Sequence, residues 1–393
     1  MRVALTTTFS PWDARAGVAQ FGTRDLADAL HRRGVDVSVV YTMEGYVEPR
    51  TDLEVPYTVR WASVLRAVRR RGAAAMSEHA APVAWALREL DQEGRIDLVH
   101  GQGEEMALVA DALPQARRVV SARALERNSQ GRGKLSAEPG PCLASSRLAL
   151  ELAHAVVVSG ARDLRASMAA PLVDWERLVA VERGLPRRFF AAEGLFAAGA
   201  PTHLLVVGGN GNGEDDEARH LLAGLQWLPE DSYLPVCWMG DFGTGRRVRP
   251  PSHLRLPPGV DCIGTADERS LQRLVGRAAE VITLDDSPRS SELLRIAIAM
   301  GKRITTCEQA PRSLVSDLEP LALRSLPTDE AGYAELLRAA SHAGSLRAPE
   351  AAQLREFARL HFSWDAVAER HIELYERLCR SGEETASAVP ESD

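Results

Sequence analysis

The chain opens with RVALTTT (2–8), SPWDARAGVAQ (10–20), FGTRDLADALHRR (21–33) and VDVSVVY (35–41), four consecutive segments that decide its fold. The first and last have the apolar, β-branched composition of buried strands. The third places apolar side chains on one side of a helix that stops at Gly34, a residue typical of helix C-caps. The order strand–loop–helix–strand predicts a parallel α/β sheet, whose carboxyl edge presents backbone N–H groups to anions and sugars.

Length and composition indicate an ordinary globular protein of two domains. The chain has 393 residues, of which 45% are hydrophobic and 26% charged. Its net charge of −7 argues against nucleic acid as a partner.

The absence of a leader segment or a long apolar run predicts a cytoplasmic protein without a membrane span. The five cysteines are scattered and lack metal-ligand spacing, so no metal is expected: Cys142, Cys237, Cys262, Cys307 and Cys379.

Strand-like and helix-like segments alternate along both halves of the chain, and the second half starts afresh with LLVVGG (204–209). We therefore predict an α/β fold of two Rossmann-like domains that face one another across a cleft. The predicted organisation is an acceptor domain over 1–190, a linker over 191–203, a nucleotide-sugar domain over 204–361, a final helix over 362–380 that returns to the first domain, and a disordered tail over 381–393.

Seven segments spread along the chain resemble the family 4 glycosyltransferases of the GT-B fold. They are AGVAQFGTRDLADALHRRGVDVSVVY (16–41), IDLVHGQGEE (96–105), LAHAVVVSGARDLRASM (152–168), VERGLPRRFF (181–190), LVGRAAEVITL (274–284), AIAMGKRI (297–304) and FSWDAVAERHIELYERL (362–378). The resemblance implies metal-independent transfer of a sugar, with retained configuration, from a nucleoside diphosphate donor. The second domain would bind that donor, and the first would hold the acceptor.

Three features usual in this family are replaced in this chain. The segment GGNGNGEDDEARH (208–220) carries no cation before Arg219, where the family has an Arg and a Lys for the diphosphate. The positions of two family glutamates are occupied by Pro288 and Ile296 when AIAMGKRI is aligned on its glycine. Arg123 stands where the family commonly has a histidine near the reacting sugar.

In the first half, the residues after the strands are candidates for acceptor binding and catalysis. Gly17 lies where a backbone can approach a ligand closely, and Gln20 and Thr23 add donors near the helix start. The alternative is that Gly17 serves only a tight turn, but the surrounding family pattern favours the ligand. Gln102 is a further acceptor-binding candidate. His100, at a strand end, is either catalytic or structural. Arg123 is placed for an acceptor carboxylate or donor phosphate, or else for an ion pair.

In the second half, two segments are candidates for donor binding. The glycine cluster contributes Gly208, Gly209, Asn210, Gly211 and Asn212, whose amides can form a phosphate nest or belong to a surface loop. The segment DDSPRSSELL (285–294) precedes a helix for which Ser290 or Ser291 is the expected N-cap. Arg289 would replace the missing cations. Glu292 would bind ribose or sugar hydroxyls, or else stabilise the first helical turn.

A basic stretch, WASVLRAVRRRGAAAM (61–76), has the spacing of an amphipathic helix. Such helices dock some lipid-glycosylating relatives on membranes, but this stretch has little apolar bulk and the protein is acidic. A solvated arginine face is the favoured interpretation, and membrane association is not expected.

The sequence thus predicts a glycosyltransferase that moves a sugar from a nucleotide donor to a small molecule, as in specialised-metabolite biosynthesis. No cofactor is expected beyond the UDP- or GDP-linked donor. The replaced histidine and glutamates favour an acceptor that needs little activation, such as a thiol, whose pKa of about 8.5 leaves some thiolate at neutral pH. Two alternatives remain: a catalytically silent relative that binds a sugar nucleotide or supports another enzyme, and a sugar-nucleotide epimerase.

Overall fold

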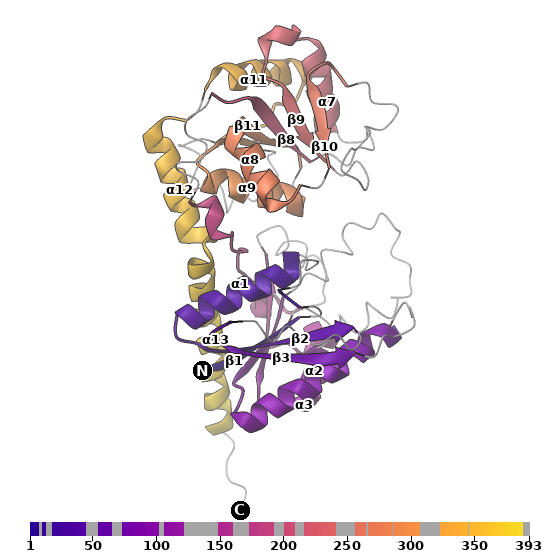
Figure 1. Cartoon of the computed structure of the whole chain (residues 1–393), viewed down its shortest axis with the longest axis vertical. Helices are drawn as coiled ribbons and strands as arrows, with labels where there is room; N and C mark the ends of the chain where they lie inside the picture. Colours follow the sequence, from indigo (N-terminus) through magenta and orange to yellow (C-terminus); the bar gives the residue numbers. More distant parts are fainter. Residues whose placement is uncertain are drawn as a thin grey trace, which may run out of the picture. The chain divides into compact units, whose positions relative to one another are not determined.

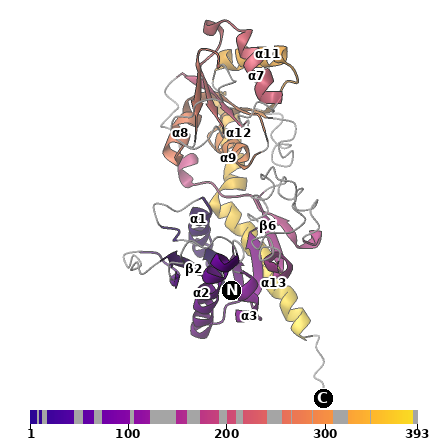
Figure 2. The same ribbon diagram turned by 90° about the vertical axis from the view of Figure 1, so that its right-hand side faces the viewer.

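The computed structural model describes residues 1–7, 10–12, 18–44, 54–64, 73–101, 106–121, 148–159, 173–191, 200–208, 216–240, 256–264, 266–285, 287–306, 323–344 and 346–387. The chain divides into two compact units. One comprises Met1–Gly184 together with Trp364–Asp393, and the other comprises Leu185–Ser363. Each has its own parallel sheet and its own hydrophobic core (Figures 1 and 2).

The first unit is built on a seven-stranded sheet in the order β3-β2-β1-β4-β5-β6-β7. All its strand pairs are parallel. The strands are β1 (Arg2–Thr7), β2 (Asp36–Glu44), β3 (Thr58–Val64), β4 (Leu98–Gly101), β5 (Arg117–Ser121), β6 (Ala155–Val158) and β7 (Leu178–Ala180). Because a parallel sheet is covered on both faces, its central strands are continuously apolar rather than alternating.

Helices cover both faces of this sheet. One face is packed by α1 (Val18–Arg32) and α13 (Trp364–Ser387). The other is packed by α2 (Ala73–Glu93) and α3 (Met106–Ala112). The predicted C-cap is confirmed: Gly34 has φ +81°, and its N–H donates to the His31 carbonyl at 2.9 Å. The final helix therefore belongs to the first unit, as the sequence predicted, and ion pairs such as Arg32–Asp365 tie it to α1.

The second unit has a six-stranded parallel sheet in the order β10-β9-β8-β11-β12-β13. Its strands are β8 (His203–Val207), β9 (Val236–Met239), β10 (Val260–Ile263), β11 (Ala278–Thr283), β12 (Arg303–Thr306) and β13 (Leu323–Ser325). One face is packed by α8 (Glu268–Arg277), α9 (Pro288–Ala299) and α12 (Ala348–Phe362). The other is packed by α7 (Asp216–Gln226) and α11 (Glu330–His342).

The structure corrects two predictions about local structure. Residues 61–64 of the expected basic helix are the end of β3, whose register on β2 runs from Thr58 to Val64. Residues 65–72 lie outside the described ranges, and residues 73–76 are helical as expected, at the start of α2. The expected tail from 381 begins as helix instead, because α13 continues to Ser387. Glu, Ala and Ser residues are compatible with a helix there, and the single Gly382 lowers helix stability by only about 1 kcal/mol.

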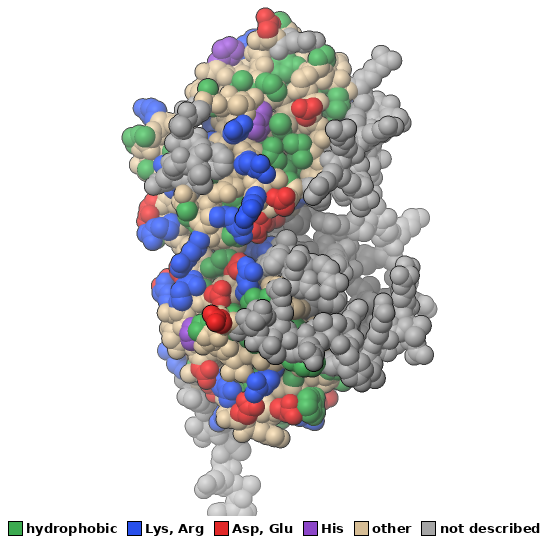
Figure 3. Space-filling model, viewed as in Figure 1, with side chains coloured by type: hydrophobic (Ala, Val, Ile, Leu, Met, Phe, Trp, Pro, Cys, Tyr) green, Lys and Arg blue, Asp and Glu red, His purple; other side chains and the backbone are tan. Residues whose placement is uncertain are grey.

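The units divide between Gly184 and Leu185 and between Ser363 and Trp364, whereas the sequence placed boundaries at 190 and 362 with a linker over 191–203. Residues 192–199 of that linker are outside the described part. Among the described residues on the face shown in Figure 3, acidic and basic side chains are interspersed. None of the helices searched in the described part has the length and apolar character needed to cross a membrane.

Candidate functional site

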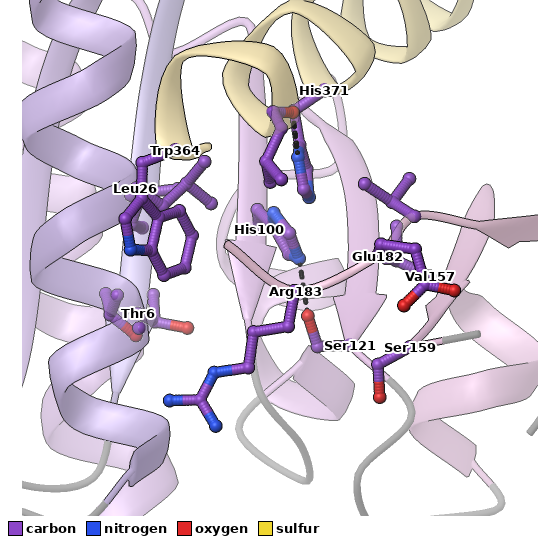
Figure 4. A pocket seen from close by; sticks show the side chains of 15 residues that line it. Thr6, Leu26, His100, Ser121, Val157, Ser159, Glu182, Arg183, Trp364 and His371 are labelled. Carbon is purple, nitrogen blue, oxygen red and sulfur yellow. Dashed lines mark hydrogen bonds between the residues drawn. The ribbon is translucent and has the colours of Figure 1, made fainter. Parts of the chain in front are cut away.

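A cavity of about 90 Å³ lies at the carboxyl edge of the sheet in the first unit (Figure 4). Parallel strands end at the same edge of a sheet, so polar residues from several strands meet there. The polar residues that line it are Thr6, Thr23, His100, Ser121, Ser159, Glu182, Arg183 and His371. Apolar walls come from α1, α13 and the strands: Leu5, Leu26, Val157, Val181, Trp364 and Val367.

His100 is held at the floor of this cavity by hydrogen bonds at both ring nitrogens. Its Nδ1 lies 2.6 Å from the hydroxyl of Tyr375 on α13, and its Nε2 lies 2.8 Å from the hydroxyl of Ser121 at the end of β5. The His371 ring stacks on it with centroids 5.4 Å apart. His371 itself donates from Nδ1 to the Val367 carbonyl at 2.8 Å. The two imidazoles therefore form a buried polar core under the cavity.

Burial keeps both rings neutral. It lowers the pKa of His100 well below its ordinary value, and the neighbouring His371 lowers it further. It also lowers the pKa of His371 to about 4. Burial raises the pKa of the Tyr375 hydroxyl, which therefore keeps its proton. A base at neutral pH needs a pKa near that pH, so this geometry favours the structural alternative for His100.

Arg183 and Trp364 are accommodated by two glycines. A Cβ built on Gly184 would lie 2.3 Å from the Trp364 ring, so only glycine fits there. A Cβ on Gly22 would lie 3.7 Å from that ring and 3.8 Å from Nε and Nη2 of Arg183. The guanidinium of Arg183 thus lies beside α1 at Gly22, while Glu182 is directed to another side of the cavity (Figure 4).

Several predicted first-unit residues cannot be placed. Gly17, Gln102 and Arg123 lie outside the described ranges, and for Gln20 only the backbone, in α1, is described. His100 and Thr23 are the predicted candidates that line the cavity. Three further cavity residues were not predicted from the sequence: Ser121, Glu182 and Arg183. Each follows or ends a strand-like run, a signal that could have found them.

The carboxyl edge of the second sheet gathers the described donor-site candidates. Gly208 follows β8 with φ +101°, and its carbonyl accepts from Trp238 Nε1 at 2.8 Å. Arg289, half-buried, donates from Nη1 to the carbonyl of Gly240, directly after β9, at 3.2 Å. A Cβ on Gly208 would lie 2.7 Å from the Asp285 carboxylate. The other cluster residues, Gly209, Asn210, Gly211 and Asn212, are outside the described part.

The start of α9 differs from the prediction. Its N-cap is Ser287, whose Oγ accepts from the Ser290 N–H at 3.2 Å, and Pro288 occupies the first turn. Ser290 donates from Oγ to Asp285 at 2.5 Å, and the Ser291 N–H donates to the Ser287 carbonyl. The expected caps, Ser290 and Ser291, were wrong because the Ser-Pro pair at 287 begins the helix earlier.

Two consequences follow for donor binding through this helix. The amides expected to be free near Ser290 are bonded within the chain. Glu292 lies beyond the first turn, which contains no acid, so the alternative of stabilising that turn was wrong, whereas the binding of ribose or sugar hydroxyls by Glu292 stays a prediction. The aligned family position Ile296 is a buried core residue. Among the described residues, no cluster of three or more His, Cys, Asp or Glu side chains is arranged to hold a metal ion.

The chain matches no protein-family model and no curated protein sequence. It is similar in structure to sucrose-phosphate synthase from Thermosynechococcus elongatus, at 15% identity over 97% of this chain and 99% of that one, with a TM-score of 0.64. It is similar to Anabaena HepE in complex with UDP at 14% identity over 96% and 99%, with a TM-score of 0.61. A Listeria monocytogenes protein assigned as UDP-N-acetylglucosamine 2-epimerase matches at 12% identity over 97% of both chains, with a TM-score of 0.53. These likenesses, with the two parallel sheets, confirm the predicted α/β fold of GT-B type.

Proposed function

We propose that this protein is a glycosyltransferase that moves a sugar from a nucleoside diphosphate donor, bound at the second sheet, to a small acceptor, bound at the first. One observation carries the proposal. The carboxyl edge of the second sheet brings together a positive-φ glycine, Gly208, and a half-buried cation, Arg289, in a fold shared with a structure solved in complex with UDP. In open α/β sheets, ligands bind outside the carboxyl ends of the strands.

Arg289 supports the diphosphate part of the proposal. Its guanidinium is directed over the end of β9 by the bond to Gly240, which uses one of its N–H donors. A guanidinium has five N–H donors in a planar fork that matches two phosphate oxygens. Sugar transfer develops negative charge on the leaving diphosphate, and a fixed cation stabilises that charge more than it stabilises the bound donor. Arg289 would thus replace the cations missing from 208–218.

Asp285 determines which part of the donor meets the end of β11. Its carboxylate lies against Gly208 and is held by the N–H of Ser287 and the hydroxyl of Ser290. A phosphate beside it would be repelled, whereas carboxylates accept hydrogen bonds from ribose hydroxyls in dinucleotide-binding sheets. We therefore place ribose or sugar hydroxyls at Asp285 and the diphosphate toward Arg289, without a bound metal and without a strong protein base.

Nucleotide binding tests this proposal directly. Calorimetric titration of the protein with UDP and GDP should give saturable binding to one of them. Arg289→Gln should weaken that binding by about ten- to a hundredfold, because charge-assisted bonds contribute about 1.5–3 kcal/mol. Arg338→Gln, which changes an exposed arginine on α11, is the matched control and should bind as the unchanged protein does. If neither nucleotide binds, the proposal is wrong.

Turnover then separates the transferase from its two alternatives. Incubation with a UDP- or GDP-sugar and acceptors bearing hydroxyl, amino or thiol groups should increase the acceptor mass by one sugar, with or without EDTA. Nucleotide binding with neither transfer nor donor hydrolysis would support the silent relative, which the internally bonded amides of α9 favour. A donor sugar whose configuration changes without transfer would support an epimerase.

A further inference from the structure

We propose that the cavity of the first unit binds a small aliphatic acid bearing a hydroxyl, amino or thiol group, with its carboxylate held by Arg183 and Ser121. The inference rests on the proposed function in one respect: in a glycosyltransferase, such an acid would be the acceptor. It assigns the acceptor class from the chemistry of this cavity and does not depend on the identity of the donor.

The size of the cavity limits the ligand. A single water needs about 10–15 Å³ of such volume, and an apolar cavity of about 150 Å³ accommodates benzene. The volume here, about 90 Å³, falls between these two. It therefore suits a ligand of a few heavy atoms, or one end of a longer molecule, rather than an aromatic ring.

The hydrogen-bond network beneath the cavity determines the direction of the Ser121 hydroxyl. Among the described residues, His100 is the partner of the fully buried Tyr375 hydroxyl. A buried donor left unbonded is rarer in proteins than an acceptor with unfilled lone pairs, so the Tyr375 O–H donates to Nδ1 of His100. A neutral imidazole that accepts at Nδ1 carries its proton on Nε2. His100 therefore donates to Ser121.

Ser121 is thereby left with its own proton to donate. Its oxygen accepts from Nε2 of His100 at 2.8 Å, and its side chain is half-buried and lines the cavity. The Ser121 O–H consequently points toward a ligand rather than toward the histidine. A ligand atom at this position must be an acceptor, and a carboxylate oxygen is a strong one.

Arg183 supplies the charge that selects an anion. Its guanidinium lies beside Gly22 of α1, with a built Gly22 Cβ 3.8 Å from both Nε and Nη2, and it lines the same cavity as Ser121. A guanidinium has donors only, and its fork matches the two oxygens of a carboxylate. Two donor groups, one from β5 and one from the segment after β7, thus line the same cavity.

Glu182 adds a carboxylate on a different side of the cavity from the Arg183 guanidinium (Figure 4). A carboxylate accepts hydrogen bonds and repels a second anion. It therefore favours a ligand whose other end is a hydroxyl, amino or thiol group. Val157, Val181 and Trp364 also line the cavity and present apolar surface to the carbon skeleton.

Matched acids and amides test the inference on the full-length protein, without donor. We would titrate the protein calorimetrically with lactate, serine and cysteine, and with lactamide, serinamide and cysteinamide. At least one acid should bind about tenfold or more tightly than its amide. That preference should fall toward unity in Arg183→Gln and fall in part in Arg183→Lys and Ser121→Ala. It should be unchanged in Arg95→Gln, an exposed arginine before β4.

The inference is overturned if no acid is preferred over its amide, or if the preference survives in Arg183→Gln. Should Arg183→Gln fail to fold, as judged by circular dichroism, an unchanged preference in both Arg183→Lys and Ser121→Ala overturns it. Titration of the same samples with UDP and GDP reports on the second sheet. Nucleotide binding without acid preference would reject only this inference, whereas acid preference without nucleotide binding would reject the proposed function and leave the ligand class of this cavity standing.

Discussion

The Nδ1 atom of His100 lies 2.6 Å from the hydroxyl oxygen of Tyr375, although 275 positions separate the two residues. His100 is on β4, in the middle of the first sheet, and Tyr375 is on α13, the last helix of the chain. Tyr375 is fully buried and His371, one turn earlier on α13, stacks on His100. The floor of the cavity is therefore assembled from both ends of the chain, and the properties of the cavity depend on how α13 is held.

Tyr375→Phe should destabilise the first unit without a change of side-chain volume. It removes the partner of His100 Nδ1 in a fully buried site, for which a cost of about 1–3 kcal/mol is expected. The acid preference of the cavity should also decrease, because the proton of His100 is then no longer fixed on Nε2. Urea unfolding followed by circular dichroism measures the first effect, and acid–amide titration measures the second.

Tyr233→Phe is the control for that substitution. Its hydroxyl donates to the carbonyl of Pro258, an exposed residue of the second unit, where water can replace the lost bond. Its effect on unfolding should be smaller, and its effect on acid binding absent. Equal losses for the two variants would contradict the assigned role of Tyr375.

Acidification should weaken the first unit through its buried histidines. Burial lowers the pKa of His371 to about 4 and that of His100 well below its ordinary value, whereas both have pKa values near 6.5 when unfolded. Between these values the unfolded chain binds more protons than the folded one. The free energy of unfolding should therefore be highest above about pH 6.5 and should fall as the pH decreases toward 4.

Urea midpoints between pH 7.5 and 5 measure this dependence. His154 contributes in the same direction, because burial and nearby arginines lower its pKa to about 4. A His371→Gln variant should consequently lose part, but not all, of the slope. A slope that is unchanged in this variant would show that His371 is not buried in its neutral form.

The sequence predicted the elements whose signal is local. The strand, helix and Gly34 cap at the start of the chain, and the restart after residue 203, follow from apolar runs and glycines that the structure confirms. β3 was missed because Trp61–Val64 adjoins an arginine-rich stretch whose spacing suits a helix. Its strand conformation is imposed by pairing with β2, which a local pattern does not contain.

The cavity was harder to predict for a related reason. His100 was found because it ends an obvious strand, but its partners come from β5 and α13, and the sequence does not show which distant residues meet. Arg183 was not predicted as a site residue, although it precedes the glycine that admits Trp364. At α9, a serine was correctly expected as the N-cap, but the cap is Ser287, which is followed by Pro288, rather than Ser290 or Ser291.

Two glycines beside Trp364 should respond in opposite directions to alanine. Gly184→Ala places a Cβ about 2.3 Å from the ring, so the ring or backbone must move, at a cost of about 1–3 kcal/mol. Gly22→Ala places its Cβ 3.7 Å from the same ring, at ordinary contact distance, inside α1. Because alanine is favoured over glycine in helices by about 0.8–1 kcal/mol, this change should stabilise the unit. Thermal midpoints of the two variants test the contrast, which fails if both shift the same way.

The start of α9 gives a similar contrast between neighbouring serines. Ser287 accepts the Ser290 N–H as N-cap, so Ser287→Ala should lower the free energy of unfolding by about 1 kcal/mol. Ser291 lies inside the helix, where alanine has the higher helix propensity, so Ser291→Ala should be neutral or slightly stabilising. Urea unfolding of both variants distinguishes the two positions. A larger loss for Ser291→Ala would place the cap where the local pattern first suggested, and would leave the amides of the turn that follows it available to a phosphate.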